Sequence, residues 1–410
     1  NRFASGKTYW ADALREAPGE NWLTYHGDYS GRRFSRLTQL DRTNVKRLAT
    51  RWVVQAEGTR RQECTPIVLD GAMYVTAGNH AYCLDARTGR QIWRHRIQLP
   101  EGVNPEVNRG VAILDQRLFV TSADCRLICL DARNGGVVWE ARIADYKLDH
   151  RLTQAPLVVK GQVVCGMGYG DWGARGYLDC YDAASGKLLW RHWTVPRPGE
   201  PGSETWPSNN NAWESGGGAT WMTGTYDPES DLVYWGTGNP APDYHGEIRI
   251  GDNLFTNCAI ALEVRTGERK WHFQFTPHDT HDWDAAECPM LIDAEWKGRQ
   301  RKLLVEANRN GFFYVLDRIT GEFLLGKEFA KQTWAKGLDA KGRPDVIPGT
   351  DPTPAGVKCC PTVEGAANWM SPSYNARYGL YYVVAQDGCD VYTSSAAPYV
   401  AGKHNYAGTG

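Results

Sequence analysis

Two aspartates two positions apart, Asp282 and Asp284, are the side chains best suited to chemistry, in the segment His278-Asp279-Thr280-His281-Asp282-Trp283-Asp284. A carboxylate can accept a proton as a general base, or it can bind a hard cation through oxygen. Asn239 offers an amide oxygen, and Arg309 offers a planar cation that pairs well with carboxylates. Each residue also has an ordinary interpretation: a capped loop carboxylate, a turn residue before proline, or a surface ion-pair partner. The residue types alone leave both interpretations open.

These candidates lie where a sequence repeat is interrupted. The phrase Leu-Asp-x-x-Thr-Gly-x-x-x-Trp returns with variations, and its acidic and final positions are Asp85/Trp93, Asp131/Trp139, Asp182/Trp190, Glu263/Trp271 and, more weakly, Asp317/Leu325. The interval from Asp182 to Glu263 is 81 residues, about thirty more than its neighbours. Functional insertions belong in loops, so we expect the chemistry in this interval and just after it.

The repeat itself predicts β structure. Each copy follows a short alternating or apolar run, and its Asp and Gly supply the chemistry of a tight turn before a second strand that ends in Trp. Successive acidic positions are 46, 51 and 54 residues apart where the rhythm is regular, which suits a four-stranded propeller blade. The best helix candidate is the short segment 7–15. The sequence therefore predicts an all-β propeller of stacked repeats.

Composition limits the partners. Lys and Arg number 46 against 47 Asp and Glu, so a nucleic-acid or anionic-membrane partner has no electrostatic support. No apolar stretch is long enough to span a bilayer. The chain begins with Asn1 rather than Met, which we interpret as a mature form from which a signal peptide has been removed.

Eleven cysteines need separate interpretation. Cys83, Cys129 and Cys180 occupy one position in three successive repeats, so we expect three buried strand residues that do not pair with one another. Better disulfide candidates are the adjacent Cys359 and Cys360 with the later Cys389. An odd count leaves at least one thiol outside a disulfide, so the composition does not settle the redox compartment.

Between and after the repeats, several tracts make the chain resemble the quinoprotein alcohol dehydrogenases, which use pyrroloquinoline quinone (PQQ). The tracts are Thr205-Trp206-Pro207, Gly216–Trp221, Gly236–Pro242, His278–Asp284 and Asn308–Arg318. The likeness runs from Trp22 to about Cys389. It implies a single domain over residues 1–410, an eight-bladed β-propeller with tryptophan-docking repeats. Family chains usually continue further, so either the propeller closes differently here or the last blades lie outside this chain.

The resemblance also implies roles for individual residues. Glu63, Arg109, Thr153 and Asn368 match cofactor contacts, and Gly168 stands where a serine often touches PQQ. Trp221 matches the indole on which the quinone lies flat. Asp282 matches the catalytic carboxylate, and Arg309 matches the arginine beside the reactive carbonyl. The predicted site residues are therefore Glu63, Arg109, Thr153, Gly168, Trp221, Arg309 and Asn368 for the cofactor, Asp282 and Arg309 for catalysis, and Asp171, Asn239, Asp282 and Asp284 for a metal.

Asp284 bears on which metal is expected. In the family, an Asp two residues after the catalytic Asp marks the lanthanide-dependent branch, and a trivalent ion of calcium-like radius favours one more hard anionic oxygen. The alternative is a solvated loop carboxylate above a calcium site. Asp171 replaces the usual Glu. His281 replaces a usual Trp, where it either polarises the substrate pocket or packs as a neutral ring.

The resemblance implies oxidation of a primary alcohol, or of a polyol or sugar hydroxyl, by hydride transfer to PQQ, with Asp282 as general base. No Cys-x-x-Cys-His occurs in the sequence, so we expect no covalent c-type haem in this chain and a separate soluble cytochrome c-type electron acceptor. Cys360 and Cys389 match the family's structural disulfide, which supports a periplasmic location. A homodimer stays open. The alternative function is a non-catalytic quinoprotein-like propeller scaffold, which would keep the repeat and lose the ligands.

Overall fold

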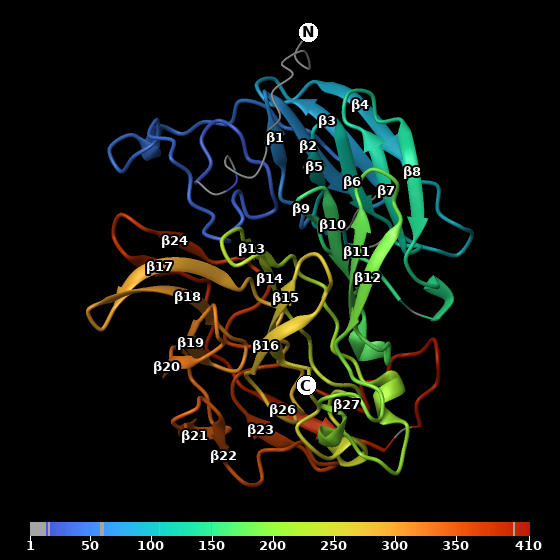
Figure 1. Ribbon diagram of the computed structural model, residues 1–410, viewed down its shortest axis with the longest axis vertical. Coiled ribbons are helices and arrows are strands. Elements are labelled where there is room, and N and C mark those ends of the chain that lie inside the picture. The colour runs from blue at the N-terminus through green and yellow to red at the C-terminus, as the bar shows by residue number, and fades with distance from the viewer. Residues whose placement is uncertain (1–13, 15–16, 58–60, 106, 149, 397) are drawn as a thin grey trace. The chain divides into compact units, whose positions relative to one another are not determined.

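The computed structural model describes residues 14, 17–57, 61–105, 107–148, 150–396 and 398–410. The helix predicted for 7–15 lies outside these residues except for Leu14. The chain divides into two compact units. Unit 1 comprises residues 1–146, 151–165 and 180–189, and unit 2 comprises residues 147–150, 166–179 and 190–410. Strands dominate the described residues, as predicted (Figure 1).

Unit 1 contains two four-stranded sheets in which strand order follows the chain. The first comprises β1 (Ile67–Leu69), β2 (Ala72–Ala77), β3 (His80–Asp85) and β4 (Gln91–Arg96), and the second comprises β5 (Ala112–Leu114), β6 (Arg117–Thr121), β7 (Arg126–Asp131) and β8 (Val137–Arg142). The inner strand β3 is buried along its whole length, whereas β4 alternates toward solvent. This gradient follows the sequence, because apolar residues fill β3 and charged residues alternate along β4.

A third sheet has its strands in residues of both units. It comprises β9 (Leu157–Val159), β10 (Gln162–Gly166), β11 (Tyr177–Asp182) and β12 (Leu188–Trp193). Between β10 and β11 lies the short 3-10 helix η3 (Gly170–Trp172), which carries Asp171.

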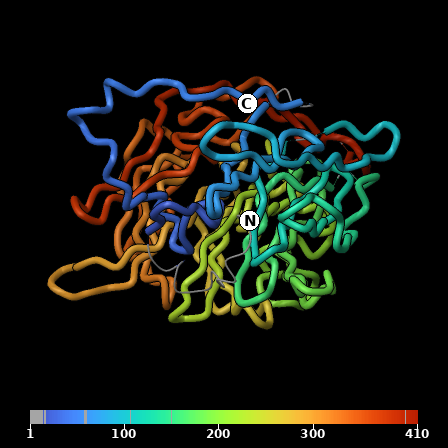
Figure 2. The backbone as a smooth tube through the Cα atoms, turned by 90° about the horizontal axis from the view of Figure 1, so that it is seen from above, coloured from blue at the N-terminus to red at the C-terminus, as the bar shows by residue number. Residues whose placement is uncertain are grey.

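Unit 2 contains two further four-stranded antiparallel sheets. Their strands are β13 (Thr225–Asp227), β14 (Leu232–Gly236), β15 (Cys258–Glu263) and β16 (Arg269–Gln274), then β17 (Met290–Trp296), β18 (Arg299–Ala307), β19 (Phe312–Asp317) and β20 (Phe323–Glu328). The end of the β17–β18 hairpin projects from its unit, as Figures 1 and 2 both show.

The last part of unit 2 forms short strands instead of another four-stranded sheet. These are β21 (Ala335–Leu338) with β22 (Pro344–Val346), β24 (Ser373–Asn375) with β25 (Leu380–Tyr382), and β23 (Val357–Cys359) with β26 (Asp390–Ser394) and β27 (Gly408–Thr409). Cys360 and Cys389 form a disulfide here. The pairing implied by the family resemblance is therefore confirmed.

The repeated tryptophan and glycine are the two halves of one contact between successive repeats. Trp93 Nε1 donates to the carbonyl oxygen of Ala132 at 3.0 Å, and its ring lies against Gly135, where an added Cβ would be 2.7 Å from Trp93 Cε3. The same arrangement joins Trp52 to Gly89, Trp139 to Gly186, Trp190 to Gly267 and Trp271 to Gly321. Each glycine has positive φ and no side chain, so the next indole can cover the turn. The phrase recurs along the chain because it docks one repeat on the next.

The turn aspartate also acts as predicted. Asp85 Oδ1 accepts hydrogen bonds from the backbone N–H groups of Arg87 and Thr88 at 3.0 and 3.2 Å. Cys83, Cys129 and Cys180 are each fully buried, as expected of small strand residues. Burial raises the pKa of the Cys83 thiol to about 12, which keeps that thiol protonated and unreactive.

Candidate active site

Six of the predicted site residues of unit 2 lie together in connections between strands. They are Asp171 in η3, Trp221 before β13, Asn239 after β14, Asp282 and Asp284 between β16 and β17, and Arg309 between β18 and β19. Regular sheets hold both ends of each connection, so the loops are fixed by their anchors. The structure brings these residues together into one connected group.

Three carboxylates meet at the centre of this group. One oxygen from each of Asp171, Asp243 and Asp282 lies within 4.8 Å of the others. Burial, together with the neighbouring Asp284, raises the pKa of Asp171 to about 7. Burial also raises the pKa of Asp243 well above its ordinary value, with further contributions from Asp171 and Asp282. Asp243 is buried and the other two are half-buried. Converging carboxylates of this kind repel one another, and their oxygens suit a hard cation.

Asp243 was not predicted from the sequence. It lies four residues after Asn239, whose Nδ2 donates to Asp243 Oδ1 at 3.0 Å. Its side chain is fully buried. Its one sequence signal is that it directly follows the Gly236–Pro242 tract. Nothing in the local sequence shows that an aspartate there will be buried beside two others.

Asp284 joins the carboxylates to the predicted aromatic and cationic groups. Asp284 Oδ2 accepts hydrogen bonds from Arg309 Nη1 at 2.8 Å and from Trp221 Nε1 at 3.2 Å. Asp284 Oδ1 accepts one from the Asn239 backbone N–H at 2.9 Å. A side chain at Gly238 would collide with Asp284 Oδ1, which explains the glycine before Asn239. Asp284 is therefore a buried, bonded residue, and a solvated loop carboxylate does not describe it.

Arg309 faces both aspartates of the segment. Its Nη2 atom lies 3.9 Å from Asp282 Oδ2 and also donates to the carbonyl of Val363. Its backbone carbonyl accepts from the N–H of Ala366 at 2.9 Å. The loop around residue 365 thus holds Arg309 from behind. Its Nε is buried and makes no hydrogen bond among the described residues, so a donor remains for a ligand.

The segment that carries Asp282 is held by Asp279. The two carboxylate oxygens of Asp279 accept the backbone N–H groups of His281 at 3.0 Å and Trp283 at 2.8 Å. His281 stacks on Trp283 with ring centroids 4.3 Å apart, and its Nε2 lies 3.0 Å from the carbonyl of Thr350. His281 is therefore a packed ring, and burial lowers its pKa. Asp282 itself adopts φ of +63°, an uncommon backbone conformation that places its carboxylate among its neighbours.

A buried arginine ties two of these loops together. Arg249, at the end of η6 (Gly246–Arg249), donates to the carbonyls of Pro242, Asp243 and Asp279 at 2.9, 3.2 and 2.6 Å. Its Nη1 also donates to Asn253 Oδ1 at 2.9 Å. Arg249 therefore positions the loop of Asp243 and the loop of Asp282 at the same time. The sequence analysis did not single it out.

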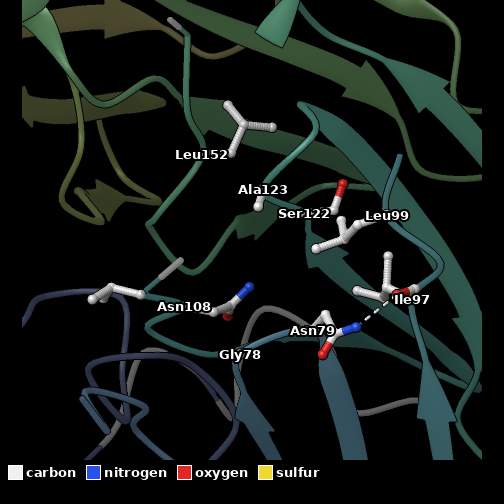
Figure 3. Close-up of a pocket in the computed structure, with 9 residues that line it drawn as sticks. Gly78, Asn79, Ile97, Leu99, Asn108, Ser122, Ala123 and Leu152 are labelled. Atoms are coloured by element: carbon white, nitrogen blue, oxygen red, sulfur yellow. Dashed lines mark hydrogen bonds between the residues drawn. The ribbon is translucent and has the colours of Figure 1, made fainter. Parts of the chain in front are cut away.

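Unit 1 brings together three other predicted residues. Arg109 Nη2 lies 2.7 Å from Glu63 Oε2, and the Arg109 backbone N–H donates to the carbonyl of Thr153 at 3.0 Å. Asn108 supports this loop, because its Nδ2 donates to the carbonyl of Thr121 at 2.8 Å. A hollow beside Asn108 is drawn in Figure 3. It has space for about one water molecule, which is too little for a cofactor.

Gly168 and Asn368, which were also predicted to lie beside the cofactor, have no described contact outside their own loops. Gly168 is buried between β10 and η3. Asn368 is half-buried, and its Nδ2 donates to the carbonyl of Glu364 at 2.7 Å within its own loop. The assignment of both residues to the cofactor stays a prediction.

A second acidic pair was also missed. Glu287 and Glu306 are fully buried, and Asn308 Nδ2 donates to Glu306 Oε1 at 2.9 Å. Burial raises the pKa of Glu306 to about 8. Burial and then the neighbouring Glu306 raise the pKa of Glu287 well above its ordinary value. Neither glutamate stands out in the sequence, since no local pattern shows that a charged residue will be buried in the folded protein.

Comparison with known proteins gives the family. Residues 22–330 match the family model described as PQQ glucose/ethanol/alcohol dehydrogenase, β-propeller domain. This chain belongs to that PQQ-dependent alcohol dehydrogenase family. The match spans about three quarters of the chain and includes most of the predicted site residues.

Individual relatives support the same family assignment. Quinohemoprotein alcohol dehydrogenase ADH IIB of Pseudomonas putida is 37% identical over 98% of this chain and 61% of its own length. The solved quinohemoprotein alcohol dehydrogenase of Comamonas testosteroni superposes with a TM-score of 0.87, at 37% identity over 92% of this chain and 59% of that chain. A europium-containing methanol dehydrogenase superposes with a TM-score of 0.90, at 32% identity over 96% of this chain and 73% of that chain. The predicted all-β propeller class is confirmed.

The chain spans about three fifths of the length of the curated relatives it matches, for example 61% of ADH IIB and 54% of the Comamonas testosteroni enzyme. In the part of the chain that the structure describes, no helix is both long enough and apolar enough to cross a lipid bilayer.

Proposed function

We propose that this chain forms the PQQ- and metal-binding part of a dehydrogenase that oxidises a primary alcohol, or a polyol or sugar hydroxyl. The observation that carries the proposal is the convergence of Asp282, Asp284 and Arg309 beside the carboxylates of Asp171 and Asp243. A general base, an oxygen-rich cation site and a fixed guanidinium are the groups that this oxidation needs.

The residues present fit both groups that the family implies. For the metal, the fit rests on the cluster of carboxylate oxygens within 4.8 Å and on the buried Oδ2 of Asp243, which has no hydrogen-bond partner among the described residues. For PQQ, it rests on the buried Arg309 with its unused Nε donor and on the half-buried indole of Trp221. We propose Glu63, Arg109, Thr153, Gly168 and Asn368 as further contacts of PQQ.

The reaction follows from the roles of these side chains. When bound, PQQ would supply the two-electron acceptor that takes hydride from the alcohol carbon. Asp282 would accept the hydroxyl proton at a carboxylate oxygen. Burial raises the pKa of Asp282 well above its ordinary value, which strengthens it as a base, and Arg309, with Nη2 3.9 Å from Asp282 Oδ2, opposes part of that rise. Asp284 Oδ2 accepts hydrogen bonds from both the Arg309 guanidinium and the Trp221 indole, and so it fixes the position of one relative to the other.

Finer parts of the proposal follow from the family. We propose a lanthanide as the metal, held by Asp171, Asn239, Asp282 and Asp284, with calcium as the alternative. We also propose an eight-bladed propeller, a soluble cytochrome c-type acceptor and a periplasmic location. The Cys360–Cys389 disulfide supports an oxidising compartment, and the europium named for one relative supports the lanthanide.

The alternative function, a non-catalytic scaffold, has less support. A scaffold would have no reason to keep buried carboxylates that repel one another, because such groups destabilise the fold unless a cation or a proton compensates them. The site residues and the family match both favour the enzyme.

The test is to denature the purified protein and to analyse the supernatant for PQQ and for metal, and to assay alcohol oxidation with an artificial electron acceptor. We expect both groups together after reconstitution, and we expect Asp282→Asn to lower kcat at least a hundredfold while PQQ stays bound. Finding neither PQQ nor metal after both are added would refute the proposal and favour the scaffold.

A further inference from the structure

Asp243 has an uncompensated carboxylate at the centre of the acidic group. Its Oδ1 accepts one hydrogen bond from Asn239 Nδ2, whereas its Oδ2 is buried and has no hydrogen-bond partner among the described residues. The nearby cation Arg249 does not serve this carboxylate through a hydrogen bond, because its Nη2 donates to the backbone carbonyl of Asp243 instead. A buried anionic oxygen left in this state costs a large free energy unless something binds it.

The Asp243 carboxylate lies beside two other carboxylates. Oxygens of Asp171, Asp243 and Asp282 lie within 4.8 Å of one another, although the three residues come from segments far apart in the chain. A single cation among them can therefore reach all three carboxylates. Arg309 borders the cluster, since it pairs with Asp284 at 2.8 Å and lies 3.9 Å from Asp282, whereas no described ion pair joins a cationic side chain to the carboxylate of Asp171 or Asp243.

We propose that Asp243 is a metal ligand of this chain, and that its Oδ2 atom adds a fourth carboxylate to the three predicted for the site and thereby favours a trivalent cation over Ca²⁺. This proposal rests on the metal site of the proposed function and assigns a ligand that the family resemblance did not. Asp171 has a shorter side chain than the Glu that the family resemblance leads us to expect at this position. Asp243 adds a further carboxylate to the same cluster.

Charge explains the preference. Adding the Asp243 carboxylate makes the set of oxygen ligands more negative by one charge. The charge of the ligand set is one of the factors that decide selectivity between ions of similar radius, so a more negative set favours a trivalent ion over Ca²⁺.

The experiment uses the full chain reconstituted with PQQ and measures metal binding directly, by tryptophan-sensitised Tb³⁺ luminescence and by calorimetry with Ca²⁺. We expect Asp243→Asn to weaken Tb³⁺ binding at least tenfold more than Ca²⁺ binding, and Asp243→Glu, which keeps the charge, to retain the Tb³⁺ preference. Glu247→Gln is the matched control, because it removes one exposed charge four residues away on the same segment. An Asp243→Asn protein whose Tb³⁺-to-Ca²⁺ ratio equals that of Glu247→Gln would overturn the proposal.

Thermal unfolding in EDTA gives a second readout that does not depend on activity. Removing one of three repelling carboxylates should raise the metal-free melting temperature of Asp243→Asn and shrink the increase that Tb³⁺ produces. An Asp243→Asn variant that is less stable than wild type in EDTA, or that fails to fold, would also contradict the proposal. If wild type binds PQQ and metal but Asp243→Asn behaves like wild type, only this inference fails. If wild type binds neither, the proposed function fails.

Discussion

The contact between Trp93 and Gly135 can be tested by adding a single methyl group. In Gly135→Ala the new Cβ would lie 2.7 Å from Trp93 Cε3, closer than such atoms approach in folded proteins. Gly71 is the matched control within the same unit: its φ of +78° is nearly the +76° of Gly135, but an added Cβ there meets nothing within 4 Å. Both substitutions therefore place alanine at nearly the same positive φ, and only Gly135→Ala also brings a methyl group against an indole.

The magnitudes follow from these geometries. A left-handed conformation costs an L residue about 1–2 kcal/mol, and alanine recovers about 0.4–1 kcal/mol by restricting the unfolded chain. Gly71→Ala should therefore destabilise by about 0.5–1.5 kcal/mol. Gly135→Ala adds overpacking of about 1–3 kcal/mol and weakens the Trp93–Ala132 hydrogen bond, worth about 1 kcal/mol. We expect a total loss of about 2–5 kcal/mol.

Urea unfolding followed by circular dichroism and tryptophan fluorescence would measure both losses. A Trp93→Leu background should remove the difference between the two alanine variants, since no indole remains to collide. Equal losses for Gly71→Ala and Gly135→Ala, within about 0.5 kcal/mol, would refute the docking contact as the reason for glycine in the phrase.

Two further predictions concern buried charges of unit 2. Replacing Arg249 by Met should lower the free energy of unfolding by about 3–5 kcal/mol in denaturant titrations, because three buried carbonyl acceptors lose a charged donor, and Arg249→Lys should fall between that variant and wild type. Glu306 should make stability depend on pH: burial raises its pKa from 4.5 to about 8, so the folded protein holds a proton that the unfolded chain releases. The stabilisation from Glu306 is complete below pH 4.5 and is lost as the pH rises to about 8, by up to about 1.4 kcal/mol per pH unit. Glu306→Gln should reduce the total slope by this share, and the other carboxylates with raised pKa values, such as Glu287 and Asp171, should keep the remainder.

Each of these predictions has a control on the same unit. Arg265→Met removes an exposed arginine and should cost little, so equal stability of the Arg249 and Arg265 variants would show that Arg249 holds nothing in place. Glu295→Gln changes an exposed glutamate of β17, in the sheet that contains Glu306. If Glu306→Gln keeps the wild-type slope between pH 4.5 and 8, another group carries the pH dependence.

The repeat could be interpreted from the sequence because its contacts are local or periodic. Asp85 caps its turn through N–H groups two and three residues away, and Trp93 reaches a glycine at the same place in the following copy. Spacing alone therefore predicted the strands, the turns and the fold class. The closure into eight blades stays a prediction, because the copies fade after Leu325.

Residues predicted for the site from unusual tracts lie together in the structure, and their roles stay predictions. Asp282, Asp284 and Arg309 do lie together, and the short distance between Asp282 and Asp284 in the sequence already placed two carboxylates on one loop. The sequence could not reveal Asp243, Arg249 or Glu306, since each is an ordinary charged residue until distant segments enclose it.

The sequence by itself determined the repeating β units and the docking of each on the next, and it marked the tract in which Asp282 and Asp284 lie. The resemblance to the family added the Cys360–Cys389 pairing. Tertiary structure alone decided the electrostatics of the site. Convergence of three loops makes Asp171, Asp243 and Asp282 a single acidic group, and burial raises the free energy needed to keep these carboxylates ionised. Burial and long-range convergence depend on the whole chain, so no local pattern encodes them.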